Sequence, residues 1–363
     1  MSLQTSSLLP RQSLTLTAAS LTVLIAFGAS ALPVPLMSTW TREFGLSTAA
    51  IGMTVLLYVI GNACSLLFFA RLSEVIGRRG AVFVSLLFGL AACAFFLLAN
   101  TPAFLMAGRL LQGLACGITT TAAMSWCVDS APPRRSWLAT AVSSSGPLAG
   151  FVIATIGAGV AIETQLAGTR GLFFCVLVLE LLVSALIFLA SETVTTKSAK
   201  KGILKPSVMP PPGYGRRLAL AAAGFVGTSA LTCFFQGLSA RVAKRLWGTD
   251  APIALFSGLV YISLVLPNAL GAFAAAKFPP LKVFAPVGLL YVVSGCGTFL
   301  SVAGRLPELF IAFALVCGAT QGRSQRPPSR CCSKARASWS ATGFSPRSTS
   351  SATWAPAFRT SSS

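Results

Sequence analysis

The stretch Ala70-Arg-Leu-Ser-Glu-Val-Ile-Gly-Arg-Arg-Gly80 joins two long apolar runs. The run before it, 46–69, is almost uncharged, and the run after it, 81–98, carries no charge at all. Each run is long enough to cross the hydrocarbon core of a bilayer, which takes about 20 residues in a helix. Three arginines in so short a connection are typical of a cytoplasmic loop between two transmembrane helices.

The composition of the whole chain also indicates a membrane protein. Hydrophobic residues make up 54% of the 363 residues and charged residues 10%, and the mean hydropathy is +0.77. A soluble domain of this length could not bury so much apolar surface. The net charge of +20 does not indicate nucleic-acid binding, because the basic residues lie between apolar runs and in the tail rather than along one soluble face.

The apolar runs predict an all-α polytopic membrane protein with about ten spans of about 20 residues each. The first run, 14–40, is too long for the core of a signal peptide and is interpreted as a span. Most Lys and Arg residues before the tail lie on one side if the N-terminus is cytoplasmic, so we expect that orientation, in a plasma (inner) membrane. The predicted spans are 14–38, 47–69, 81–99, 103–125, 137–161, 170–190, 217–238, 252–275, 283–303 and 307–321.

A polar segment separates the first six predicted spans from the rest. Residues 191–216 are rich in Lys, Ser, Pro and Gly and are predicted to be a cytoplasmic linker between an N-terminal half, 1–190, and an incomplete C-terminal half of four helices, 217–321. An ordinary long loop is the alternative. The run that begins at Pro102 matches the run that begins at Pro307 at four of twelve positions, which favours two related halves.

The chain changes character after Gln321. Residues 322–363 are rich in Ser, Arg and Pro and contain no acidic residue, so we expect a basic, disordered tail. Our hypothesis is that a frameshift or a misread exon has replaced further membrane spans. A natural cytoplasmic tail is the alternative.

The loop quoted above resembles the signature loop between helices 2 and 3 of the major facilitator superfamily of secondary transporters. Ala70 stands at the family's glycine, Glu74 at its aspartate and Val75 at the arginine that usually follows this aspartate, while Gly77 matches the pattern. The resemblance implies a bundle of two helical halves with about 10 helices in place of the family's about 12.

Two roles are open for the charges of this loop. Glu74 could cap a helix N-terminus or pair with Arg78 or Arg79, and so stabilise one access state. The arginines could instead serve only to fix the topology.

Arg109 lies well inside the fourth predicted span. An arginine at the bilayer centre costs about 2.5–3.5 kcal/mol on insertion scales, which implies a protein or water partner unless the side chain snorkels to the interface. The run Arg109-Leu-Leu-Gln112-Gly113 resembles the helix-4 motif of proton-coupled members of the family. In that motif the arginine faces the central cavity, so the resemblance implies a role of Arg109 and Gln112 in substrate or proton coupling.

The chain contains no histidine and only eight acidic residues, so a proton carrier must be a carboxylate. The first predicted span has no acidic residue. Glu180, in the middle of the sixth span, is the best remaining candidate for reversible protonation. Helix 6 is peripheral in the family, which leaves a structural role as the alternative.

The fifth predicted span contains Gly146-Pro147-Leu-Ala-Gly150, which resembles the core of a motif associated with the antiporter branch of the family. Proline removes a backbone hydrogen bond and bends a helix, while small residues permit close helix contact. We expect a hinge there, with ordinary small-residue packing as the alternative.

The sequence contains no nucleotide-binding loop, metal-ligand cluster or catalytic triad, so we expect neither enzymatic activity nor a cofactor nor a metal site. The first hypothesis is a monomeric antiporter in the lipid bilayer that takes protons in and moves a small amphipathic compound out. An uptake permease for a metabolite and a non-transporting truncated membrane protein remain open.

Overall fold

The computed structural model describes residues 4–132, 136–194, 242, 244–248 and 280–324. The chain divides into two units, Met1–Gln325 and Arg326–Ser363, and the second lies outside the described residues. Most of the predicted linker, the predicted spans 217–238 and 252–275 and nearly all of the predicted tail also lie outside them. The division into two halves therefore stays a prediction.

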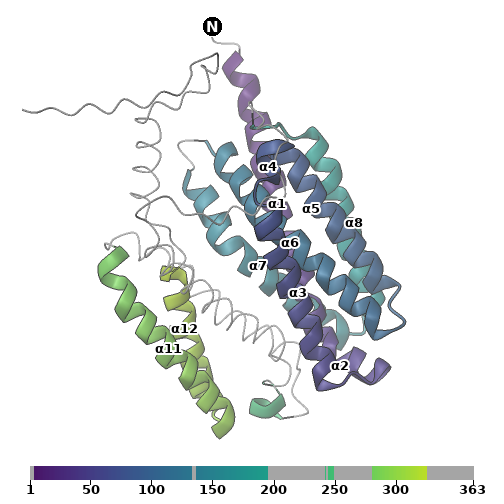
Figure 1. Ribbon diagram of the computed structural model, residues 1–363, viewed down its shortest axis with the longest axis vertical. Coiled ribbons are helices and arrows are strands. Elements are labelled where there is room, and N and C mark those ends of the chain that lie inside the picture. The colour runs from purple at the N-terminus through teal and green to yellow at the C-terminus, as the bar shows by residue number, and fades with distance from the viewer. Residues whose placement is uncertain (1–3, 133–135, 195–241, 243, 249–279, 325–363) are drawn as a thin grey trace, which may run out of the picture. The chain divides into compact units, whose positions relative to one another are not determined.

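Regular structure in the described residues is α-helical, as predicted (Figure 1). Six helical stretches in the described residues are long and apolar enough to cross a membrane, and they overlap the first six predicted spans; the first of them, Arg11–Met37, runs from α1 into α2. The later helices α11 and α12 contain shorter apolar stretches, Gly288–Gly304 and Pro307–Thr320. The helices are α1 (Gln4–Ala31), α2 (Pro33–Phe44), α3 (Thr48–Phe68), α4 (Leu72–Val75), α5 (Arg78–Leu97), α6 (Pro102–Ser130), α7 (Ser136–Glu163), α8 (Thr169–Leu189), α11 (Pro280–Gly304) and α12 (Pro307–Ser324).

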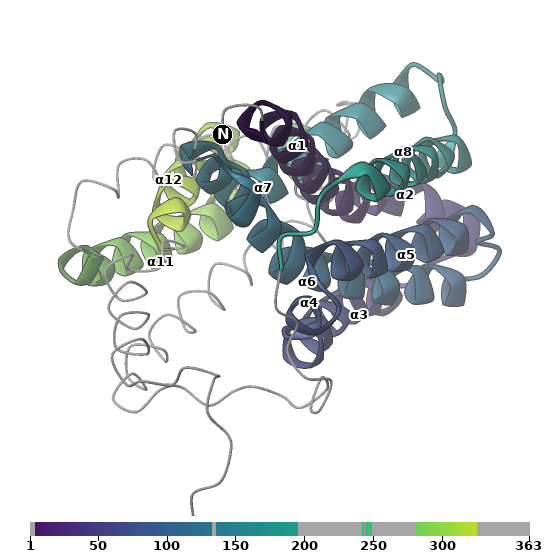
Figure 2. The same cartoon turned by 90° about the horizontal axis from the view of Figure 1, so that it is seen from above.

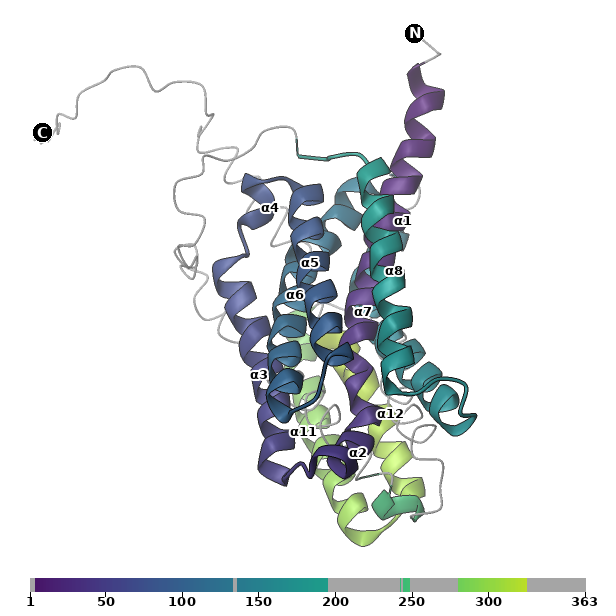
Figure 3. The same cartoon turned by 90° about the vertical axis from the view of Figure 1, so that its right-hand side faces the viewer.

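The first predicted span is two helices in the structure. α1 ends at Ala31, and α2 begins at Pro33, a position where the missing N–H of proline costs no helical hydrogen bond. α2 ends at Phe44, and Gly45, with a left-handed φ of 61°, closes the helix. We call α1 to α8 the N-terminal part. Figure 3 shows α2 and α4 at opposite ends of its helices.

α6 is the central helix of the N-terminal part. It packs against α1, α3, α5 and α7, and α5 in turn lies between α6 and α8 (Figure 2). α8 is peripheral and exposes large apolar side chains, among them Leu182 and Leu189, as expected of a surface that meets lipid. The functional side chains predicted on α6 are therefore enclosed. A side chain on α8 is buried only if it lies on the face that meets the other helices.

Candidate functional site

Arg109 and Gln112 are both buried in the interior of the N-terminal part. Arg109, which is 1% exposed, donates from Nη1 to the backbone oxygen of Ser30 at 2.7 Å and lies 3.5 Å from Oε1 of Gln112. Its guanidinium carbon lies 5.9 Å from the centroid of the Tyr58 ring, within reach of a cation–π interaction. The structure thus brings the two predicted residues together with α1 and α3, and Arg109 does not snorkel to an interface.

The break between α1 and α2 explains why α1 offers acceptors to these side chains. In a continuous helix the carbonyl of Ala29 would accept from the N–H of residue 33, but Pro33 has none. Gln112 Nε2 donates to that carbonyl at 2.8 Å instead. The proline four residues after Ala29 was the sequence signal for this acceptor, and sequence reasoning missed it.

Glu180 is also buried, at 1% exposure, and it lies on the face of α8 that meets α5. The Cys93 thiol on α5 donates to its Oε2 at 3.7 Å. Its carboxyl group also lies so close to Gly89 that a Cβ there would collide with it. The described side-chain hydrogen bond of Glu180 goes to α5, whereas those of Arg109 go to α1 and to Gln112 on its own helix.

The signature loop forms a turn around the short helix α4. Ala70 is half-buried, and Gly77 adopts a φ of 95°, which favours glycine. Glu74 pairs with Arg71 at 3.7 Å, and both side chains are largely exposed. The predicted pairing of Glu74 with Arg78 or Arg79 is absent from the described contacts, because both arginines are engaged elsewhere.

Arg78 and Arg79 bind groups on neighbouring helices. Arg78 Nε donates to Asp129 Oδ2 at 3.0 Å, and its Nη1 donates to the Ser73 hydroxyl at 2.6 Å. Arg79 donates to the backbone oxygen of Phe188 at 2.8 Å, and its guanidinium carbon lies 5.5 Å from the centroid of the Phe188 ring. The two arginines thus connect the loop to the ends of α6 and α8.

Glu192, in the segment that follows α8, caps the N-terminus of α5. Its Oε1 accepts from the backbone N–H of Arg78 at 2.9 Å, and its Oε2 accepts from that of Arg79 at 3.1 Å. These are the first two N–H groups of α5, which have no intrahelical partner, and Gly77 offers no side chain to cap them. We name Glu192, Arg78, Arg79 and Asp129 the loop clasp.

Gly146, Pro147 and Gly150 lie within α7, which runs through Pro147 without interruption. Gly150 lies against the backbone of α1, at the carbonyl oxygen of Leu24 and the N–H of Gly28, where a Cβ would collide. The small residues therefore hold α7 close to α1. A hinge at Pro147 stays a prediction.

Sequence reasoning missed several partners at these sites. Asp129 lies just beyond the end of a predicted span, and Glu192 lies in the predicted linker, and neither belongs to a motif. Only the structure shows that the segment after α8 lies beside the start of α5, so that Glu192 caps a helix that begins more than a hundred residues earlier. Among the described residues, no group of three His, Cys, Asp or Glu side chains could hold a metal ion.

Comparison with known proteins identifies the family. The sequence model of the Major Facilitator Superfamily matches residues 19–343. The chain is 27% identical over 245 residues to the uncharacterized MFS-type transporter YybF of Bacillus subtilis (strain 168), which covers 65% of this chain and 54% of that protein. The chain thus spans about half the length of this curated relative.

Solved structures show the same fold. A bacterial homolog of the human lysosomal transporter Spinster, in an inward-facing and occupied conformation, matches with a TM-score of 0.62 at 17% identity over 90% of this chain and 78% of its own. Its unoccupied form matches with a TM-score of 0.61 at 16% identity, over the same shares of the two chains. The family model, the curated relative and the fold agree: this chain belongs to the Major Facilitator Superfamily.

Proposed function

We propose that this chain is a secondary active transporter that exports a small amphipathic compound in exchange for protons. We propose further that it acts as a monomer by alternating access, in the plasma (inner) membrane, with its N-terminus in the cytoplasm. Family and fold favour a transporter over an enzyme. The observation that carries the proposal is the buried pair Arg109 and Gln112, fixed by α1 and α3 in the interior of the N-terminal part.

A guanidinium in this position has the properties that coupling requires. Arginine stays charged at every physiological pH, and charges interact far more strongly in a low-dielectric interior than in water. The energy of any ionisable group on a substrate that approaches Arg109 therefore depends on whether that group carries a proton. Gln112 and Ser30 hold the side chain in place, so the charge does not relax towards the surface.

Glu180 is our candidate for the proton-binding group. A carboxyl enclosed between two apolar helices is costly as an anion unless it is paired, so it favours loss and gain of a proton in step with access to water. Its nearest described donor is the Cys93 thiol, a weak one. A movement of α8 relative to α5 that opens this contact to water would release the proton.

We propose that the loop clasp and α7 take part in the movement between the access states. Breakage of the contacts that join α4 and α5 to α6 and α8 would release the signature loop during the change of access. Because α7 lies in close contact with α1, a bend at Pro147 would also move the helix whose Ser30 carbonyl binds Arg109.

Expression in a bacterial strain that lacks its own efflux pumps tests the proposal. We expect the chain to raise the inhibitory concentration of some amphipathic toxic compounds and a protonophore to abolish the effect. Arg109→Gln should abolish it too, while Arg42→Gln, a change at an exposed arginine on α2, should leave it intact at equal membrane abundance.

Sensitisation to a compound would favour the uptake alternative instead. Resistance that persists in the presence of a protonophore would refute proton coupling.

A further inference from the structure

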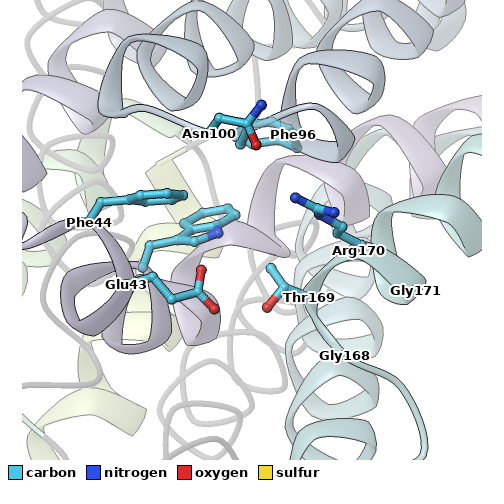
Figure 4. Close-up of a pocket in the computed structure, with 10 residues that line it drawn as sticks. Glu43, Phe44, Phe96, Asn100, Gly168, Thr169, Arg170 and Gly171 are labelled. Carbon is cyan, nitrogen blue, oxygen red and sulfur yellow. The ribbon is translucent and has the colours of Figure 1, made fainter.

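A cavity of about 550 Å³ lies at the end of the N-terminal part opposite the signature loop. Residues from the end of α2, the connection after α5 and the start of α8 line it (Figure 4). Its volume falls within the range of about 300–1,000 Å³ that is usual for small-molecule sites. All its lining residues lie in one compact part of the chain, and none belongs to the Arg109 site.

The wall of the cavity includes a rigid aromatic stack. The Trp40 ring lies parallel to Phe96 at a centroid distance of 5.7 Å and to Phe173 at 5.9 Å, and the two Phe rings stack at 4.6 Å. Trp40 is 2% exposed and lines the cavity. Its indole N–H has no hydrogen-bond acceptor within the described part of the chain. Trp40 contributes an aromatic face to the cavity wall.

Two opposite charges reach into the cavity from different helices. Figure 4 shows the carboxylate of Glu43, at the end of α2, and the guanidinium of Arg170, at the start of α8, directed towards the same space. Among the described residues neither forms an ion pair. Asn100 and Thr169 add an amide and a hydroxyl to the lining. The site thus offers a cation and an anion, held apart, above an aromatic wall.

We propose that this cavity binds a zwitterionic group, in which an anionic oxygen group and an ammonium belong to one molecule. The anionic oxygens accept from the Arg170 guanidinium. The ammonium binds the Glu43 carboxylate. Glu43 repels a simple anion, and Arg170 repels a simple cation. Only a ligand that carries both charges can pair each of these two side chains with a group of opposite charge.

The same chemistry is found in the headgroup of an ethanolamine phospholipid and in a soluble zwitterion. The test uses the full-length protein in maltoside micelles and isothermal titration calorimetry with glycerophosphoethanolamine. We expect it to bind at least about tenfold more tightly than glycerol 3-phosphate or ethanolamine, since each charged hydrogen bond contributes about 1.5–3 kcal/mol. Equal binding of the three probes, or none, would overturn the proposal.

Variants at the two charges give a crossed result that a loss of folding could not produce. Glu43→Gln should weaken binding of the zwitterion about tenfold yet strengthen that of glycerol 3-phosphate. Arg170→Gln should also weaken the zwitterion yet strengthen ethanolamine. Arg42→Gln, at an exposed residue outside the cavity lining, should change none of the three. Unchanged binding of the zwitterion in both cavity variants would refute the assignment.

Nanodiscs separate the two sources of the ligand. If phosphatidylethanolamine discs, but not phosphatidylglycerol discs, abolish the binding of glycerophosphoethanolamine, a lipid headgroup occupies the site. Undiminished binding in both discs identifies a soluble zwitterion, and either result supports the zwitterion site. Transport in the export assay above is a separate measurement, so this proposal can fail while the proposed function stands.

Discussion

Removal of the Glu192 carboxylate should loosen the first turn of α5 by an amount that the contacts predict. Glu192→Ala takes away the acceptors of the Arg78 and Arg79 amides, bonded at 2.9 and 3.1 Å. Loss of a helix cap costs about 0.5–2 kcal/mol, and loss of a negative charge at a helix N-terminus costs about 0.3–1 kcal/mol more. α5 begins with two arginines and has no acidic residue in its first turn, so nothing within the helix compensates.

Because Glu192 is exposed, we take about 1–2 kcal/mol for the whole change, which raises the population of the open first turn about 5- to 30-fold. Hydrogen exchange measured by mass spectrometry on the full-length protein reads this population directly. Exchange of the peptide that contains Arg78 and Arg79 should accelerate by that factor, while exchange in the middle of α5 should not change.

Glu74→Gln is the matched control. It removes the same charge from the same end of the molecule, yet Glu74 pairs only with exposed Arg71 at 3.7 Å in the described contacts. Exchange at the start of α5 should stay within about twofold of the parent chain, since an exposed pair contributes only about 0–1 kcal/mol. Equal acceleration in the two variants, or none in Glu192→Ala, would show that the capping argument is wrong.

Three further changes test the packing by thermal unfolding in detergent. Gly150→Val should lower the unfolding temperature through a collision with the α1 backbone worth about 1–3 kcal/mol, whereas Gly157→Val, on the same helix, should have little effect because nothing lies within 4 Å of its added Cβ. Asp129→Asn should lower stability by only about 0.2–1 kcal/mol, because its ion pair with the signature loop is partly exposed; a larger loss would contradict this estimate. Gln112→Leu should cost about 1–3 kcal/mol, because it leaves the buried carbonyl of Ala29 without the Gln112 donor; an unchanged unfolding temperature would argue against that contact.

Much of the fold was predictable because a membrane restricts what a sequence can do. In hydrocarbon a spanning segment must satisfy its own backbone, so an apolar run of sufficient length predicts a helix. The first six predicted spans agree with the helices of the N-terminal part. The break at Pro33 was missed because the apolar run continues through it and length alone was counted.

The sites were harder to predict than the helices. Arg109 could be identified because a buried charge is costly wherever it lies in a span. Its partners could not be identified, because a backbone carbonyl of Ser30 leaves no trace in the residue type. The capping role of Glu192 could not be predicted for a related reason. The sequence at the start of α5 shows that the helix has no cap of its own, but it does not show which distant carboxylate supplies the cap.

The position of Glu192 also determines where the helices α1 to α8 could be cut from the rest of the chain. A fragment ending at Ala190, the predicted boundary, would discard Ser191, whose backbone bonds Thr15 at 3.0 Å and Trp126 at 3.2 Å, together with the carboxylate that caps α5. A fragment that ends after Val194 keeps all of these ties. Anyone who expresses this portion alone, or joins it to a foreign sequence, should place the junction four residues later than the hydrophobicity profile suggests.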